Sequence, residues 1–90
     1  MKLMITSKRI RSESLTQQLQ QFLESPHRRP GPGVKMLGRW FTPTFDAIYV
    51  LVETEDVKLV SDWLLHWTDF ATHEITPVMD DADVAQLLAK

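Results

Sequence analysis

The stretch GRWFTPTFDAIYVLVE, which spans residues 38–53, decides the fold. Both of its ends are rich in β-branched and aromatic residues, which favour strands, and its middle holds the turn-forming run Pro43-Thr44-Phe45-Asp46. The pattern predicts two antiparallel strands, over residues 34–42 and 47–53, that are joined by the short connection. A hairpin of this kind needs further strands or helices to cover its apolar side chains, so the rest of the chain must supply them.

The apolar pattern on either side of this hairpin switches between a period of about two and a period of about 3.6. One helix follows the cap Ser14 and ends near Ser25, and a second helix follows the cap Asp56. The other predicted elements are a strand over 2–8, a loop over 26–33, a strand over 72–79 and a short terminal helix capped by Asp80 or Asp81. This order predicts an α+β fold, a ferredoxin-like βαββαβ sandwich with an antiparallel sheet and an extra C-terminal helix, in a single domain over residues 1–90.

Composition and charge narrow the classes of partner. Ten basic and twelve acidic side chains give a net charge of −2, so no long-range field attracts nucleic acid or an anionic membrane. The strand over 47–53 lacks an RNA-recognition phrase, and cysteine is absent from the chain. No apolar stretch approaches the ~18 residues of a membrane helix. We expect a soluble, cytoplasmic protein that binds neither nucleic acid nor membrane. The basic residues Lys8, Arg9, Arg11, Arg28 and Arg29 are interpreted as solvated loop charges.

Strand parity assigns side chains to the two faces of the sheet, of which the two helices cover one and leave the other open. Pairing about the turn sets Trp40 opposite Tyr49 and Gly38 opposite Leu51, so these residues share a face. Because burying an unpaired Arg39 is costly, we expect the Trp40 face to lie under the helices, with Gly38 admitting a helix at close range. The expected open face then carries Leu37, Arg39, Phe41, Ile48, Val50, Val52, Met4, Thr6, Glu74, Thr76 and Val78, while Leu3, Ile5, His73, Ile75 and Pro77 point inward.

The expected open face mixes many apolar side chains with a few polar ones, and such a surface is too apolar to face water alone. A symmetric pairing of two of these faces buries both at once. The sequence therefore predicts a homodimer that forms through the open sheet face.

Three phrases carry a resemblance to a known family. They are Gly38-Arg39-Trp40 on a strand, Trp63-Leu64-Leu65-His66-Trp67-Thr68-Asp69 at the end of a helix, and Glu74-Ile75-Thr76-Pro77-Val78 on a strand. Together with Glu53 at the end of the hairpin, they resemble a bacterial family of unknown function. A ferredoxin-like chain that pairs face to face is also similar to the dimeric α/β barrels, which include cofactor-free monooxygenases, haem-degrading enzymes and ligand binders. The family commonly has His after the strand Trp, whereas this chain has Phe41.

Arg39 and Glu74 are the first candidate site residues, because both lie in these phrases and both are expected on the open face. A guanidinium suits a carboxylate or a phosphate, and Glu74 can orient it or act as a base when desolvated. The alternative is a structural ion pair at the dimer seam. Thr6 and Thr76 either supply hydroxyls to the same ligand pocket or occupy strands by propensity alone. Phe41 forms an apolar wall in either case.

Other groups of residues in the sequence predict neither a metal site nor a cofactor site. His66, Asp69, His73 and Glu74 match no standard spacing of metal ligands. The chain also lacks a glycine-rich phosphate loop and a nucleophile elbow. The residues Trp63 and Trp67 lie four positions apart on an apolar helix face, and we interpret them as core packing rather than as an aromatic ligand cage.

Three functions are consistent with these patterns. The first is a homodimeric binding or regulatory subunit that recognises a small organic ligand or a protein partner. The second is a cofactor-independent, monooxygenase-like enzyme in which Arg39 and Glu74 polarise a small aromatic substrate. The third is a purely structural dimerisation module.

Overall fold

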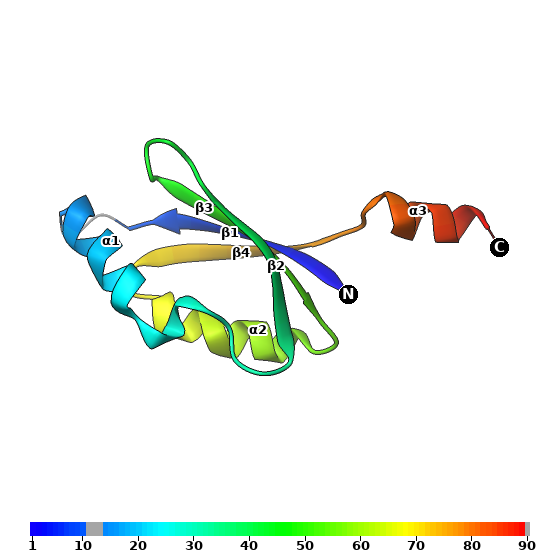
Figure 1. Ribbon diagram of the computed structural model, residues 1–90, viewed down its shortest axis with the longest axis horizontal. Coiled ribbons are helices and arrows are strands. Elements are labelled where there is room, and N and C mark those ends of the chain that lie inside the picture. Colours follow the sequence, from blue (N-terminus) through cyan, green and yellow to red (C-terminus); the bar gives the residue numbers. More distant parts are fainter. Residues whose placement is uncertain (11–13, 90) are drawn as a thin grey trace.

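The structure, a computed structural model, describes residues 1–10 and 14–89. Arg11, one of the basic residues interpreted as loop charges, lies outside the described residues. The elements follow the predicted order, and two short 3-10 turns extend α1 and α2 (Figure 1). They are β1 (Lys2–Arg9), α1 (Leu15–Glu24), η1 (Pro26–Arg28), β2 (Val34–Phe41), β3 (Ala47–Thr54), α2 (Val57–Leu64), η2 (Leu65–Trp67), β4 (Ala71–Val78) and α3 (Asp81–Leu88). The predicted ferredoxin-like α+β arrangement with a C-terminal helix is confirmed.

The four strands form one antiparallel sheet in the order β2-β3-β1-β4. The predicted pairing of the hairpin is confirmed, because Trp40 lies opposite Tyr49 and Gly38 lies opposite Leu51. The backbone N–H of Thr42 donates to the carbonyl of Ala47 at 3.0 Å and closes the connection. A β-bulge interrupts the β2–β3 register between Met36 and Gly38.

The helices begin at the predicted caps. The side chain of Ser14 accepts a hydrogen bond from the backbone N–H of Gln17, and that of Asp56 accepts one from Lys58. Both helices lie on the same side of the sheet (Figure 1). The core consists of the buried strand residues Leu3, Ile5, Val50 and Val52 together with Val60, Trp63 and Leu64 of α2.

The covered face of the sheet is not the one expected for the hairpin. Leu3 and Ile5 point inward as predicted, and they pair directly with Val52 and Val50 of β3. Residues directly opposite each other in a ladder share a face, so the register with β1 turns Val50 and Val52 toward the helices. The expectation that the Trp40 face is covered was therefore wrong. The covered face carries Arg39, Phe41, Ile48, Val50 and Val52, and the open face carries Trp40, Tyr49 and Leu51.

Arg39 tolerates this position because its side chain finds polar and aromatic contacts there. It is half-buried, its guanidinium donates a hydrogen bond to the backbone carbonyl of Arg28, and it lies 4.9 Å from the ring centroid of Phe22. A backbone acceptor and an aromatic ring both offset the cost of partial desolvation. The premise that burial of an unpaired arginine excludes this face did not hold, since burial is partial and Nη2 pairs with a backbone carbonyl.

The open face presents an aromatic surface. Trp40 is 53% exposed and Tyr49 is 39% exposed, and the indole of Trp40 lies over Gly38, where a Cβ atom would collide with it. Gly38 thus makes room for a side chain on the open face rather than for a helix on the covered face. Met4 pairs with Leu51 beside these aromatic residues.

The outward residues of β1 and β4 lie as predicted. Thr6 pairs with Tyr49 on one side and with Glu74 on the other, and Met4 pairs with Thr76. These positions alternate with the buried Leu3 and Ile5, so they belong to the open face. Glu74 and Thr76 are exposed, and Thr6 is half-buried.

Helix α3 extends away from the sheet rather than packing on it (Figure 1). Its apolar side chains are exposed, with Val84 at 42%, Leu87 at 53% and Leu88 at 82%. Asp80 caps the helix in a capping box with Asp83, which confirms one of the two predicted caps. No helix of the described residues is long and apolar enough to cross a membrane.

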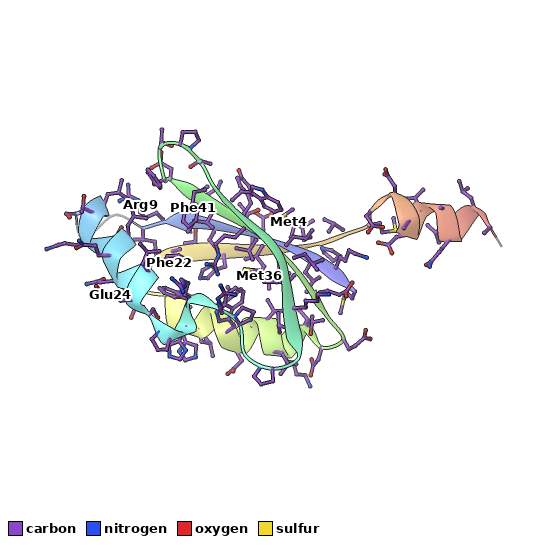
Figure 2. All side chains as sticks on the ribbon, in the orientation of Figure 1. Met4, Arg9, Phe22, Glu24, Met36 and Phe41 are labelled. Atoms are coloured by element: carbon purple, nitrogen blue, oxygen red, sulfur yellow. The ribbon has the colours of Figure 1, made fainter. Side chains whose placement is uncertain are left out.

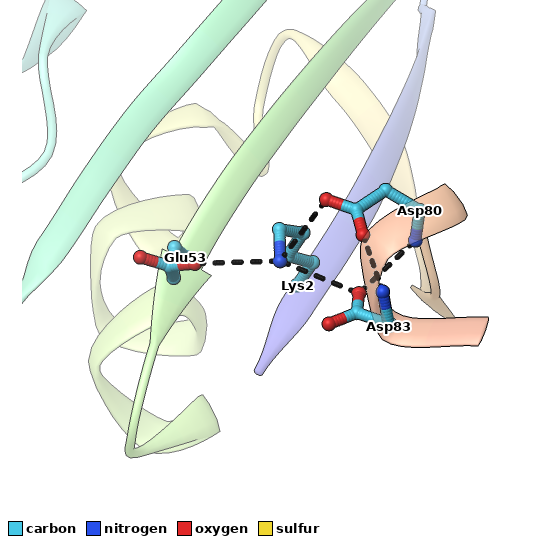
Figure 3. A network of polar contacts seen from close by, with 4 residues as sticks. All are labelled: Lys2, Glu53, Asp80 and Asp83. Atoms are coloured by element: carbon cyan, nitrogen blue, oxygen red, sulfur yellow. Dashed lines mark hydrogen bonds and ion pairs between the residues drawn. The ribbon is translucent and has the colours of Figure 1, made fainter. Parts of the chain in front are cut away.

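An ion cluster ties the start of α3 to the sheet. The Nζ atom of Lys2 lies 3.3 Å from carboxylate oxygens of both Asp80 and Asp83, and 3.7 Å from that of Glu53 (Figure 3). Hydrogen bonds that Lys2 donates to the carboxylates of Asp83 and Asp80 raise its pKa. Charged contacts at its first turn therefore hold α3 to the end of the sheet, while its apolar side chains stay exposed.

Candidate functional site

A cavity of about 110 Å³ lies between the covered face of the sheet and the two helices α1 and α2, and it is partly open to solvent. Its walls are mainly apolar. Strands contribute Ile5, Ser7, Arg9, Arg39, Phe41, Ile48, Val50, Ala71 and His73, the β2–β3 connection contributes Phe45 and Asp46, α1 contributes Leu15, Gln18, Leu19, Gln21 and Phe22, and the α2 region contributes Trp63, Leu64, Trp67 and Phe70. A concave, apolar space with a few polar groups is the usual form of a small-molecule site.

Ser7 and His73 meet in the wall of this cavity. They are direct cross-strand partners of β1 and β4 on the covered face, and the Oγ atom of Ser7 lies 2.8 Å from Nδ1 of His73. Burial lowers the pKa of His73, and the backbone of Trp67 opposes this shift in part. The imidazole is therefore neutral at pH 7. Its Nε2 atom is buried and forms no hydrogen bond of ordinary geometry in the described part of the chain, although the backbone of Trp67 lies close enough to the ring to raise its pKa.

A second polar group joins the end of β1 to α1. Nη1 of Arg9 donates to Oε1 of Gln18 at 3.3 Å, and Nη2 of Arg9 lies 3.7 Å from a carboxylate oxygen of Asp46. The contact with Arg9 fixes the amide of Gln18, because its oxygen must face the guanidinium. Nε of Arg9 and Nε2 of Gln18 are buried donors without partners among the described residues.

Aromatic rings form the wall on the β2 side. Phe22 contacts Phe41 edge to face, with ring centroids 5.8 Å apart, and it also contacts Trp67 at 5.5 Å. Phe45 adopts a left-handed backbone conformation with φ of 62°, which is rare for a bulky residue, and its ring lies 6.3 Å from that of Phe41. Figure 2 shows Arg9, Phe22 and Phe41 at the same end of the molecule, beside α1.

Trp63 and Trp67 line the cavity and also hold the segment that follows α1. Trp63 is buried, as the core interpretation requires, but its Nε1 atom also donates to the carbonyl of His27 at 2.8 Å. Trp67 donates to the same carbonyl at 3.1 Å, and Arg39 donates to the next carbonyl, that of Arg28. These three side chains therefore anchor η1, a short segment whose proline has no backbone N–H to donate.

The structure separates the predicted site residues into two groups. Arg39 and Phe41 line the cavity, whereas Thr6, Glu74 and Thr76 lie on the open face and are not part of its wall. The expected ligand clamp or seam ion pair between Arg39 and Glu74 is wrong, because the two side chains lie on opposite faces of the sheet. Arg39 instead contacts Phe22 and the carbonyl of Arg28.

The sequence did not identify Ser7, Arg9, Gln18 or His73 as residues of the cavity. The interpretation of Arg9 as a solvated loop charge is wrong, because this residue ends β1 and its side chain is 14% exposed. His73 was considered only as a metal ligand. A signal for two of them was present. Ser7 continues the buried alternation of Leu3 and Ile5, and His73 shares the inward parity of Ile75, so both are polar residues in an otherwise apolar stripe. Gln18 and Arg9 carry no comparable signal, because long polar side chains at a helix edge or strand end are ordinary.

The described residues contain no group of three or more His, Cys, Asp or Glu side chains that could hold a metal ion. His66 does not meet His73, since its ring stacks on that of His27 with centroids 3.6 Å apart. Chemically, the cavity offers two unpaired donors, one from the guanidinium of Arg9 and one from the amide of Gln18, and a neutral imidazole oriented by a hydroxyl. Such a set can bind a small polar organic molecule and can accept a proton from it.

Comparison with known proteins gives a family and no function. No curated protein and no solved structure matches the chain. A family model does match, over residues 1–90, and its description is "Domain of unknown function (DUF3303)". The chain belongs to this DUF3303 family.

Proposed function

We propose that the protein binds a small organic molecule in the cavity between the covered face of the sheet and helices α1 and α2. One observation carries this proposal. Three polar atoms in the wall of a mainly apolar cavity, Nε of Arg9, Nε2 of Gln18 and Nε2 of His73, are buried without hydrogen-bond partners among the described residues. Leaving a buried donor or acceptor unpaired costs about 1–3 kcal/mol, so such atoms are rare unless a ligand or ordered water pairs with them.

Other buried side-chain N and O atoms of the described residues are paired, which sets these three atoms apart. The hydroxyl of Thr54, a residue that is 3% exposed, donates to the carbonyl of Gly33 at 2.8 Å. The indole of Trp63 donates to His27. The fold therefore satisfies polar groups where it needs them only for structure, and the unpaired atoms gather where the molecule also has space.

Binding is tested by NMR with small neutral probes, 2-butanol and phenol, which fit the size and the mixed polarity of the cavity. Titration is expected to shift the amide signals of Ser7, Ile48, Ala71 and His73 in a saturable way. The substitution Ala71→Leu fills the cavity and is expected to abolish these shifts. Ala47→Leu makes the same change at a position outside the cavity wall and is expected to keep them.

Two results of this titration would contradict the proposal. One is the absence of saturable shifts in the wild-type protein, which would leave the cavity as a space for ordered water alone. The other is an equal loss of the shifts in both alanine variants, which would show that the probes do not occupy the cavity.

We further propose that two copies of the chain associate through the open sheet face. The observation behind this second role is the exposure of Trp40 and Tyr49 beside Met4 and Leu51, together with the unpartnered apolar side of α3. The open face also carries charges of both signs, such as Lys8 and Glu74, so two copies can approach without a strong repulsion between like charges. A symmetric dimer buries both aromatic surfaces.

Sedimentation velocity over a range of concentrations tests this association. The wild-type chain is expected to sediment as a dimer at high concentration, and Leu51→Lys on the open face is expected to give a monomer. Leu65→Lys is the matched control, because Leu65 is 68% exposed in the α2 region, outside the open face. A wild-type protein that stays monomeric at every concentration, or a control that dissociates as readily as Leu51→Lys, would contradict the proposal.

A further inference from the structure

The unpaired polar atoms of the cavity differ in what they require of a partner. Nε of Arg9 and Nε2 of Gln18 belong to side chains that already touch, through the 3.3 Å hydrogen bond between Nη1 of Arg9 and Oε1 of Gln18. Both atoms can only donate. This part of the wall therefore requires a ligand group with two acceptor sites close together, and a carboxylate is such a group.

The charge of the wall points to the same group. Arg9 and Arg39 line the cavity, and Asp46 is the carboxylate that faces them from the described lining residues. Asp46 is largely exposed and lies 3.7 Å from Arg9, and no carboxylate of the described residues forms an ion pair with Arg39. Burial, followed by the nearby charges of Arg28 and Arg29, lowers the pKa of Arg39. A bound anion would offset this excess of positive charge.

His73 can pair with a different group of the ligand. Its Nδ1 atom is paired with the hydroxyl of Ser7, and Nε2 is the donor or the acceptor according to which nitrogen carries the proton. A ligand hydroxyl satisfies either arrangement, since it can donate and accept. The neutral imidazole also favours an uncharged polar partner over a second carboxylate.

Size and wall chemistry limit the rest of the ligand. A closed cavity of roughly 150 Å³ holds benzene, and this one is about 110 Å³ but partly open to solvent, so a ligand of about five to seven non-hydrogen atoms fits if part of it lies in the open mouth. The walls beyond the polar atoms are apolar, formed by Phe22, Phe41 and Ile48. The carbon skeleton of the ligand can therefore be short and unsubstituted.

We propose that the ligand is a small hydroxycarboxylic acid. Its carboxylate accepts hydrogen bonds from Nε of Arg9 and Nε2 of Gln18, its hydroxyl pairs with Nε2 of His73, and its carbon skeleton contacts the aromatic wall. This assignment rests on the proposed binding function of the cavity and adds to it the charge and the functional groups of the ligand.

Calorimetric titration of the full chain with matched probes tests the assignment. L-lactate and 3-hydroxybutyrate carry both groups, lactamide lacks the negative charge, and propionate lacks the hydroxyl. Lactamide loses a charge-assisted hydrogen bond, so its dissociation constant is expected to be at least about tenfold higher than that of the better hydroxy acid. Propionate loses a hydrogen bond between neutral groups, so its dissociation constant is expected to be roughly two- to tenfold higher.

A matched pair of variants locates the carboxylate. Gln18→Glu places a carboxylate of the protein itself beside Arg9, and it is expected to abolish binding of the hydroxy acids. Gln20→Glu makes the same change at an exposed position on the same helix, outside the cavity wall, and is expected to leave binding unchanged. Circular dichroism verifies that both variants fold, and the probe series on the wild-type protein tests the proposal independently of them.

The outcomes separate this inference from the binding function on which it rests. Lactamide binding as tightly as L-lactate, or Gln18→Glu binding the acids as the wild type does, would overturn the carboxylate assignment. Propionate binding as tightly as L-lactate would overturn the hydroxyl assignment. In each of these cases saturable binding of 2-butanol or phenol would still support the cavity as a binding site, and failure of all the probes would overturn both proposals.

Discussion

The two faces of one sheet carry similar kinds of residue and yet face different surroundings. The covered face has Arg39, Phe41 and His73, which line the cavity under the helices, while the open face has Trp40, Tyr49 and Glu74, which are exposed. Adjacent residues in β2 thus belong to different surfaces. The aromatic and charged residues of a strand therefore do not decide which of its faces a helix covers. The face is decided by the register with a neighbouring strand whose buried side is clear from its apolar pattern.

The strand β1 is what decides the faces here. Its inward residues Leu3 and Ile5 are 1% and 0% exposed, and their cross-strand partners Val52 and Val50 follow them into the core. The cost of placing Arg39 on the same face is small beside the gain from burying four apolar side chains, because the guanidinium keeps a backbone acceptor and an aromatic contact.

The largest expected effect contrasts one leucine from each face. Leu3→Ala removes a fully buried side chain and is expected to lower the free energy of unfolding by about 2–5 kcal/mol. Leu51→Ala on the open face, measured at a concentration low enough to keep the chain monomeric, is expected to lower it by much less. Urea unfolding followed by tryptophan fluorescence measures both. Equal losses in the two variants would show that the faces are not distinct in the isolated chain.

A smaller effect concerns the pH dependence of stability. Burial lowers the pKa of His73 in the folded protein. The imidazole of His73 therefore binds a proton in the unfolded chain as the pH falls through about 6.5, but in the folded protein it does so only at lower pH. The contribution of His73 to stability is therefore complete above that pH and is lost as the pH falls below it. His73→Gln is expected to flatten this part of the curve.

Urea unfolding of the wild type and of His73→Gln between pH 8 and pH 5, roughly the range in which histidine titrates, measures the difference. The difference between the two curves isolates His73 from the other histidines. If the stability of the variant falls with pH as steeply as that of the wild type, residues other than His73 cause the difference in proton binding between the folded and unfolded states.

The smallest effect on global stability is expected in α3. Asp80→Ala removes the capping box, so the helix over 81–88 is expected to fray, while the unfolding midpoint of the sheet changes little because α3 does not pack on it. Hydrogen exchange of the amides of Val84 and Leu87 reports the fraying. Asp81→Ala, at a first-turn position outside the capping box, is the control and is expected to leave exchange nearly unchanged. A large drop in global stability in Asp80→Ala would contradict the isolated position of this helix.

The sequence predicted the elements well because their signals are local. The caps Ser14, Asp56 and Asp80 and the turn after Phe41 each act within a few residues, so the bounds of helices and strands follow from the chain itself. The sheet order follows from the element order of the ferredoxin-like fold.

The site was predicted only in part because its signals are not local. Arg39 and Phe41 were identified as site residues but were placed on the open face. The prediction considered only the cost of burying Arg39 and left out the register between β1 and β3. Gln18 meets Arg9 only because α1 crosses the end of β1. That contact depends on packing, which no spacing along the chain reveals.

Methyl NMR on a chain labelled at isoleucine, leucine and methionine tests the central claim most directly, namely that the covered face binds a small molecule and the open face binds a second copy. Addition of 2-butanol, and then of L-lactate in a separate sample, is expected to shift the methyl signals of Ile5 and Ile48 and to leave those of Met4 and Leu51 in place. Dilution is expected to do the reverse. Shifts of Met4 and Leu51 with the probes, or of Ile5 and Ile48 alone on dilution, would contradict the account.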